Sequence, residues 1–240
     1  MPNSTQNLTL TNEQPFRLML DGDGIHRFGG TSDVRGAIPH GSTVPLQLVL
    51  ELDLTDERLP IAADRPLRKL PLLYPFKYGC GGPEVQYSVI ADDEIQILHM
   101  SDLEPDDPDE QYLQVDELPQ VTLKCEPLAY EQARIVYFMD YDGHFQPNDS
   151  DRQILSELND PFYIPLGGRR QYIANAGDII CRNPECEFHD RGVYFKYLAM
   201  VPAIPVNGDT SFWCEFEGDV HFCFVLCYYC GTVIAFNVCS

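Results

Sequence analysis

Two cysteine pairs stand within residues 181–240 of this 240-residue chain. Cys181 and Cys186 occur in "CRNPECEFH", where Asn-Pro favours a tight turn. Cys227 and Cys230 occur in "CYYCG", where Gly231 suits a knuckle whose backbone amides point at thiolate sulfurs. Two close pairs of soft ligands from distant chain segments are what tetrahedral zinc requires. We therefore predict a zinc site at these four cysteines.

A zinc ion held by four thiolates has no open coordination position, so the predicted site is structural and not catalytic. His189 follows Cys186 by three residues and is an alternative ligand in place of one thiolate. The other interpretation of clustered cysteines is that they are small buried apolar side chains. We expect that role for Cys214, Cys223 and Cys239, which alternate with aromatic residues.

The nine cysteines also bear on location. The N-terminal sequence lacks the basic start and apolar block of an export signal, which predicts a cytoplasmic protein. Thiols remain reduced there, and metal ligation is the usual reason for them to cluster. No run of eighteen apolar residues occurs, so we expect no membrane span.

Charge is strongly unbalanced, with 37 acidic and 16 basic residues and a formal net charge of -21. Such a field repels nucleic-acid phosphate and attracts cationic partners. We expect a basic protein partner and no nucleic acid, with plain solubility as the alternative reason for the charge. The candidate partner-binding segment is "SDLEPDDPDE", which is otherwise a solubilising loop. Its acidic residues are Asp102, Glu104, Asp106, Asp107, Asp109 and Glu110.

Hydrophobic patterning predicts a mostly β (α+β) fold with one or two short helices. Apolar or alternating runs bounded by turn residues predict strands. They cover residues 45–54, 70–79, 84–90, 94–100, 120–126 and 133–140. The short "ADD" at 91–93 predicts a hairpin. The best helix is "NDSDRQILSELND", with Ser150 as its cap and Gln153 three residues later.

The chain also shows a weak internal repeat. "IHRFGG" (25–30) and "YIPLGG" (163–168) each precede a loop and an apolar strand, and the two halves then keep an offset of 150 residues. Leu48 falls on Leu198, and Cys80 falls on Cys230. This predicts a two-lobed, pseudo-duplicated sheet protein packed as one globular unit. We expect residues 1–14 to be a flexible lead-in, 15–145 the N-terminal half, and 146–240 the C-terminal half with the predicted zinc-binding lobe.

The motifs "RFGGTSDV", "PLQLVLELDL", "VYFMDYDG", "CRNPEC" and "FCFVLCYYCG" together carry a family resemblance. The chain resembles the YwqG-like family of uncharacterised bacterial proteins over most of residues 25–238. It is more distantly similar to the C-terminal domain of programmed cell death protein two. The resemblance implies a two-lobed β-rich fold without known enzymatic activity. For the eukaryotic relatives it implies chaperoning of a basic ribosomal protein, and for bacterial members an immunity or accessory role.

Two Asp-x-Asp-Gly stretches offer an enzymatic alternative. "DYDGHF" places Asp140, Asp142 and His144 close together, as a hydrolase could use them for a hard metal or for acid–base chemistry. "DGDGIH" (21–26) has the same pattern. Asp-Gly is also a favoured hairpin turn, which gives both stretches a structural interpretation. No Walker loop, G-x-S-x-G or H-E-x-x-H motif accompanies them.

The second Gly-Gly pair is a possible anion or small-ligand site. Gly167 and Gly168 could form a nest of backbone amides, and Arg169 and Arg170 follow directly. The glycines could instead serve only the backbone, at positions that need positive φ or close strand approach. The sequence leaves both interpretations open.

Overall fold

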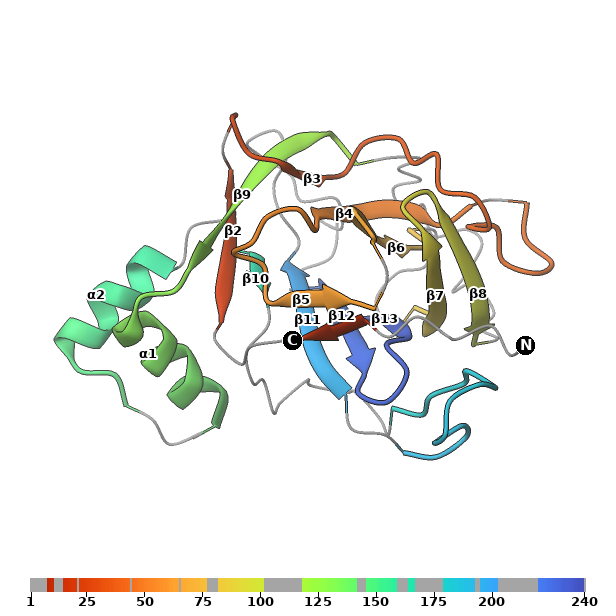
Figure 1. Cartoon of the computed structure of the whole chain (residues 1–240). Helices are drawn as coiled ribbons and strands as arrows, with labels where there is room; N and C mark the ends of the chain where they lie inside the picture. Colours follow the sequence, from red (N-terminus) through yellow and green to blue (C-terminus); the bar gives the residue numbers. More distant parts are fainter. Residues whose placement is uncertain are drawn as a thin grey trace, which may run out of the picture.

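The computed structural model describes residues 8–10, 15–20, 22–43, 45–64, 66–76, 82–101, 118–141, 146–158, 164–166, 179–192, 195–202 and 220–239. These residues form a mostly β fold, as the sequence predicted (Figure 1). The strands are β1 Leu8–Leu10, β2 Phe16–Leu20, β3 His26–Phe28, β4 Gln47–Asp53, β5 Ile61–Ala63, β6 Lys69–Tyr74, β7 Val85–Ala91, β8 Glu94–Met100, β9 Val121–Pro127, β10 Ile164–Leu166, β11 Phe195–Pro202, β12 Val220–Cys227 and β13 Val233–Cys239. The helices are α1 Tyr130–Tyr141 and α2 Asp149–Leu158.

Eleven of these strands form one antiparallel sheet, in the order β6-β4-β3-β9-β2-β10-β11-β12-β13-β7-β8. The remaining two, β1 and β5, pair with each other. Strand β1 lies inside the predicted flexible lead-in of residues 1–14, so that prediction is wrong for residues 8–10. Its alternation explains the strand, because Leu8 and Leu10 are buried while Thr9 between them is exposed.

The sheet repeats a three-stranded meander, which supports the predicted duplication. Strands β3, β4 and β6 lie side by side, and so do β10, β11 and β12. In both meanders the first strand is the three residues directly before a Gly-Gly pair. A bulge also interrupts the next pairing in each meander, between Leu48 and Leu50 in β4 and between Tyr197 and Ala199 in β11, one residue apart at the offset of 150 residues. The shared order of the strands and the nearby bulges are consistent with the predicted duplication.

The two halves also exchange a strand at the centre of the sheet. β2 precedes the first meander in sequence but pairs with β10 of the second. β9 precedes the second meander but pairs with β3 of the first, and β2 and β9 pair with each other. Residues 15–145 and 146–240 therefore share one continuous sheet and one main hydrophobic core.

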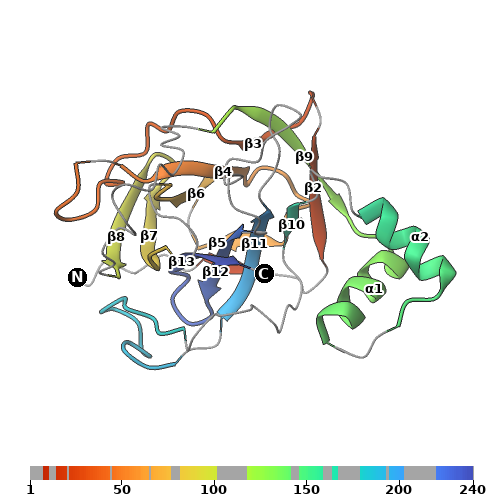
Figure 2. The ribbon, with the colours of Figure 1, turned by 180° about the vertical axis from the view of Figure 1, so that it is seen from behind.

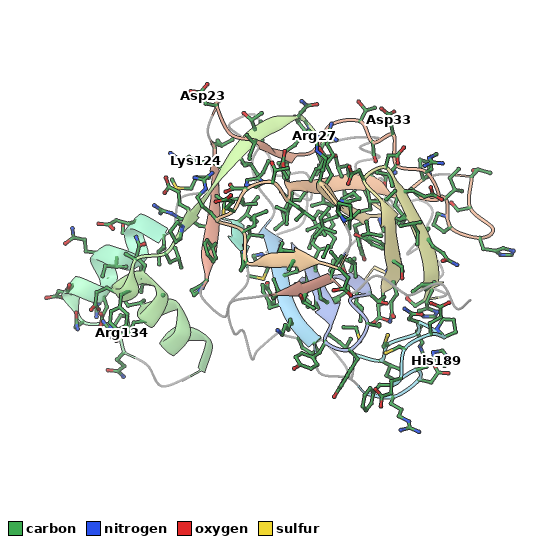
Figure 3. The ribbon with its side chains drawn as sticks, in the orientation of Figure 1. Asp23, Arg27, Asp33, Lys124, Arg134 and His189 are labelled. Atoms are coloured by element: carbon green, nitrogen blue, oxygen red, sulfur yellow. The ribbon has the colours of Figure 1, made fainter. Side chains whose placement is uncertain are left out.

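The chain crosses over β9 between β2 and β3. β2 ends with Leu20 opposite Leu123, and β3 begins with His26 opposite the same residue on the other side. Gly24 lies on the crossing, where an added Cβ would be 2.2 Å from the carbonyl carbon and oxygen of Leu123. Figure 3 shows Asp23 at the outer surface of this crossing. In the first Asp-x-Asp-Gly stretch, Gly24 therefore allows the backbone to cross β9 closely.

The sheet curls until its β6 edge meets β7, so that both halves enclose a common core (Figures 1 and 2). Buried Tyr87 of β7 links these strands. The backbone N–H of Leu73 donates to the Tyr87 hydroxyl at 2.9 Å, and that hydroxyl donates to the Pro71 carbonyl at 3.2 Å. Burial raises the pKa of the Tyr87 phenol, which keeps it a donor. The outer edge of β6 is thus closed by a side chain.

The first helix contradicts the strand predicted at 133–140. Its start is capped by Gln132, whose Oε1 accepts the backbone N–H of Ala129 at 3.0 Å. Arg134 then binds Glu131 on its own helix and Asp151 on α2, at 2.7 and 2.9 Å. Capping and this inter-helix ion pair outweigh the β-branched and aromatic composition of the segment.

The second helix confirms the predicted one, with a different cap. The Asn148 side chain accepts the backbone N–H of Asp151 at 2.9 Å, and Asp151 in turn accepts the Asn148 N–H at 3.1 Å. This is a reciprocal capping arrangement two residues before the predicted Ser150. Both helices lie beside the sheet, outside β2 and β9 (Figure 2).

The strand crossing predicts opposite outcomes for two neighbouring glycines. Gly24→Ala should lower the free energy of unfolding by about 2 kcal/mol or more, because its Cβ overlaps the Leu123 backbone. Gly22→Ala is the matched control, since nothing lies within 4 Å of its added Cβ, and should change stability by less than about 0.5 kcal/mol. Urea unfolding of both variants checks this. Equal effects of the two substitutions would contradict the crossing.

Candidate metal centre

The four predicted cysteines come together in the interior. Their sulfur atoms all lie within 4.8 Å of one another, and all four residues are buried. Cys181 Sγ lies 3.6 Å from Cys230 Sγ, and Cys186 Sγ lies 3.9 Å from Cys227 Sγ. These distances exceed the bond of about 2.05 Å in a disulfide, and the four thiols are free. The group could hold a metal ion.

The sulfurs come from two segments that are distant in sequence. Cys227 is the last residue of β12, and Cys230 lies in the turn that leads to β13. Cys181 and Cys186 lie in the loop of residues 179–192, called the cysteine loop below, which passes beside this turn (Figure 1). Gly231 closes the turn at φ +67° and donates its N–H to the Cys227 carbonyl at 2.9 Å. Its positive φ is the reason for glycine at this position.

Backbone amides point at three of the sulfurs. The N–H of Asn183 donates to Cys181, those of Tyr229 and Cys230 donate to Cys227, and that of Thr232 donates to Cys230. Each acceptor sulfur belongs to a cysteine two or three residues before its donor. This is the knuckle geometry predicted from the glycine after the second pair, and it stabilises the thiolate form.

Asn183 shapes the cysteine loop and attaches it to the hairpin. Its Oδ1 accepts the N–H of Glu185 at 2.9 Å, and its backbone carbonyl accepts the N–H of Cys186 at 2.9 Å. Its Nδ2 donates to the Thr232 hydroxyl at 3.0 Å. The Thr232 oxygen lies 3.1 Å from Cys230 Sγ. One buried side chain therefore sets the turn of the first pair and its distance from the second.

Gln86 of β7 holds the start of the cysteine loop and was missed by sequence reasoning. Its buried amide donates to the Ile180 carbonyl at 2.6 Å and accepts the Arg182 N–H at 2.8 Å. It thus bonds the backbone on both sides of Cys181, as a neighbouring strand would. The available signal was a glutamine within the apolar run "VQYSVI", which requires hydrogen-bond partners once it is buried.

The crowded thiols strongly affect one another's ionisation. Hydrogen bonds from Cys181 and Cys227 lower the pKa of Cys230 to about 2, with help from Thr232. Hydrogen bonds with Cys227 and Cys230, together with burial, raise the pKa of Cys181. The hydrogen bond with Cys181 lowers the pKa of Cys227. The hydrogen bond with Cys230 and burial outweigh this effect and raise that pKa to about 12. Without a metal ion, the surrounding protein groups therefore favour a thiolate at Cys230 and oppose the ionisation of Cys181 and Cys227.

His189 is not part of the sulfur group. Its side chain is 40% exposed, and its Nε2 lies 3.1 Å from Asp190 Oδ2. Figure 3 shows it at the outside of the cysteine loop. Its replacement of a thiolate, the alternative left open by the sequence, is not the arrangement found. Cys223 is buried in an apolar cluster, as expected for a cysteine outside the two pairs.

Several predicted site residues lie outside the described residues. These are Asp102, Glu104, Asp106, Asp107, Asp109, Glu110, Asp142, His144, Gly167, Gly168, Arg169 and Arg170. Asp140 lies in the last turn of α1, where the sequence had suggested the end of a strand. Within the described part of the chain, the four cysteines form the one group of three or more metal-ligating side chains close enough to share an ion.

His26, the histidine of "DGDGIH", is fully buried. Its Nε2–H donates to Asp56 Oδ2 at 3.1 Å, and its Nδ1 accepts the Asp53 N–H at 3.1 Å. Burial lowers its pKa, although Asp56 acts in the opposite direction. Both ring nitrogens are occupied, so neither can take a proton from a substrate. Nearby Cys125 is equally unsuited to catalysis, because burial raises its pKa to about 12.

Comparisons with protein-family models, curated proteins and solved structures find no match for this chain. Among the described residues, neither helix is long and apolar enough to cross a membrane.

The contacts of Gln86 predict an effect on metal binding. Gln86→Leu should weaken the binding of Co²⁺ at least about tenfold, because two backbone groups beside Cys181 lose their partners. Absorption of the thiolate–cobalt complex measures the affinity. Gln96→Leu on β8 is the control, since Gln96 is exposed, and should leave the affinity unchanged. Equal affinities of wild type and Gln86→Leu would contradict the role given to Gln86.

The environment of His26 predicts a pH dependence. Its pKa is lower in the folded chain than the ordinary 6.5, so the unfolded chain binds the extra proton first. The contribution of His26 is therefore complete above about pH 6.5 and is lost as pH falls below it, by at most about 1.4 kcal/mol per pH unit. Arg58 stays charged, and Cys125 stays neutral. Asp53 and Asp56, whose pKa values are lowered, titrate only in more acidic solution.

The measurement is urea unfolding between pH 5 and 8 in wild type and in His26→Gln. The variant should be less stable at pH 8, and its stability should depend less on pH below 6.5. Identical pH slopes for the two proteins would contradict a buried neutral His26.

Proposed function

We propose that Cys181, Cys186, Cys227 and Cys230 bind one structural zinc ion. A tetrahedron of sulfurs with zinc–sulfur bonds of about 2.3 Å has edges of about 3.8 Å. The two closest sulfur pairs, at 3.6 and 3.9 Å, fall on either side of that value. The dication would also remove the resistance of the crowded thiols to ionisation. Four thiolates fill the coordination shell, so no position is left for a substrate or a reactive water.

The ion would join the cysteine loop to the β12–β13 hairpin. The local cluster holds only the four cysteines, with Phe188 and Tyr229 packed against it. The two aromatic rings stack with their centroids 3.8 Å apart, one from each segment. This contact is small, and metal–sulfur bonds would supply most of the remaining cohesion.

We further propose that the chain is a cytoplasmic, zinc-stabilised interaction protein that binds a basic protein partner. The main support for this proposal is the buried group of four cysteines. Bound to a structural metal ion, these most distinctive side chains of the chain would stabilise the fold and would not catalyse a reaction. The net charge of -21 supports a cationic partner. The resemblance to the YwqG-like family is consistent with a chaperone-like, immunity or accessory role. The segment with Asp102, Glu104, Asp106, Asp107, Asp109 and Glu110 is the proposed acidic contact.

The hydrolase alternative gains no support from the described residues. Asp140 is helical, its suggested partners Asp142 and His144 lie outside the described residues, and His26 has both ring nitrogens engaged. A second proposal on these residues therefore has no observation to rest on.

Removing one zinc ligand predicts a loss of both metal and stability. Cys227→Ser should lower the zinc content from one ion per chain to well below half. It should also reduce the free energy of unfolding by about 3 kcal/mol or more. Cys223→Ala is the control, because Cys223 is equally buried but lies outside the sulfur group, and it should retain one zinc. Elemental analysis and urea unfolding measure the two quantities. Full zinc content in Cys227→Ser would contradict the proposed site.

The charge of the chain predicts that binding of its partner weakens as the salt concentration rises. Immobilised protein should retain basic proteins from a lysate at low ionic strength and release them as salt rises above about 0.15 M. A variant with the six acidic residues of 102–110 changed to Asn or Gln should retain several-fold less. Mass spectrometry identifies the retained proteins. Retention of acidic proteins alone, or of none, would contradict the proposal.

A further inference from the structure

Strand β8 (Glu94–Met100) ends the eleven-stranded sheet. Its inner edge pairs with β7, while its outer edge is met at one point by Arg35. Arg35 donates its N–H to the Asp93 carbonyl at 2.8 Å, and its own carbonyl accepts the N–H of Ile95 at 2.9 Å. This is one step of a parallel strand ladder. The chain then turns away at Gly36, whose φ is +76°.

The register of β8 shows which backbone groups remain on the outer edge. Ile95 directs its N–H outward to Arg35, and alternation along the strand directs Ile97 outward too. Beyond the bulge between the Tyr87–Ile97 and Gln86–His99 pairs, Ser101 donates inward to Glu84 at 3.0 Å. Met100 therefore faces outward. No described residue pairs with the outward backbone of Ile97 or Met100.

The two edge strands of the sheet, β6 and β8, differ in how far their outward backbone groups are already occupied. The β6 edge is closed by the Tyr87 hydroxyl and by Pro71, which has no N–H to offer. β8 contains no Lys, Arg or Pro, three residues that often prevent another strand from adding to an edge, and its protective feature is the bulge between Ile97 and His99. Ile97, Leu98 and Met100 are only partly buried. The outer edge of β8 thus offers both hydrogen bonds and apolar contact.

We propose that the outer edge of β8 binds an extended basic segment of the protein partner as an added strand. This inference rests on the proposed function and names where and how the partner docks. Main-chain hydrogen bonds to Ile97 and Met100 would supply part of the affinity, as in other cases of strand addition. The alternating side chains of the segment would place apolar groups against Leu98 and cations toward solvent.

Charge selects this occupant over a second copy of the chain. Asp93 and Glu94 stand at one end of β8, with Arg35 as their local cation. Glu84 adjoins the other end. Asp190, which pairs with Arg182 at 2.7 Å, is close enough to His99 to interact with it electrostatically. In sequence, the most acidic stretch of the chain follows directly after Ser101. Pairing two β8 edges would bring two chains of charge -21 together, whereas a cationic segment is attracted.

A pair of synthetic peptides tests this proposal. One is an alternating Lys-Val peptide of about eight residues, the length of a typical strand. The other has the same sequence with an N-methyl group on every backbone amide, so its charge is equal but neither of its edges can donate a hydrogen bond. The unmodified peptide should bind the wild-type protein at least about tenfold more tightly, since only it can donate main-chain hydrogen bonds to the outer edge of β8. Fluorescence anisotropy at low salt measures the affinities.

Hydrogen exchange supplies a second, independent readout. The amides of Ile97 and Met100 should gain protection when the unmodified peptide binds. Ile97→Pro removes one outward N–H without removing a bond to β7, and should weaken peptide binding several-fold in a folded protein. If this variant fails to fold, the peptide pair and the exchange measurement on wild type still decide the question.

The remaining outcomes separate this inference from the proposed function. Equal binding of both peptides without protection of β8 would overturn the edge site and leave a charge-driven partner in place. If neither peptide binds but basic proteins are still captured from lysate, the edge site is overturned and the charge-driven partner remains. If neither peptide binds and no basic protein is captured from lysate, both proposals are overturned. Protection of Ile97 and Met100 by self-association would make a second copy the occupant and overturn the inference.

Discussion

Four buried sulfur atoms within 4.8 Å of one another are the constraint on which the carboxy-terminal part of this structure depends. Uncharged thiols at this spacing gain little, and several thiolates would repel one another in a site that excludes water. A bound dication would resolve the conflict, because it would bind all four sulfurs and neutralise much of their charge. Among the described residues, the apolar contacts around the site are few, so the proposed cross-link would add much of its stability. Phe188 and Tyr229 provide one ring stack between the cysteine loop and the hairpin.

The site nevertheless depends on both halves of the chain. Gln86 belongs to β7 in the amino-terminal half, and it bonds the cysteine loop on both sides of Cys181. β7 in turn extends the sheet from β13, the strand that follows the second cysteine pair. The strand exchange at β2 and β9 joins the same two halves at the centre of the sheet. Metal binding and folding of the sheet should consequently be coupled over both halves.

Local patterns in the sequence predicted much of this arrangement. Alternating apolar residues identified β4, β6, β7, β8 and β9, and the spacing of the cysteines identified all four members of the sulfur group. The segment at 133–140 was misassigned, because its β-branched composition was outweighed by a Gln132 cap and by the contact of Arg134 with α2. The role of Gln86 and the crossing at Gly24 depend on residues far away in sequence, Arg182 and Leu123. A glutamine in an apolar run indicates that it needs hydrogen-bond partners, but the sequence does not show which distant residues supply them.

Native mass spectrometry of the protein, purified without added metal or chelator, tests the central claim most directly. Zinc bound by four thiolates adds the mass of one zinc atom and removes the four cysteine protons. The account predicts a single species at that mass, and its collapse to the mass of the bare chain after acidification. A native species at the mass of the bare chain, with its four thiols immediately reactive toward alkylating reagents, would contradict it.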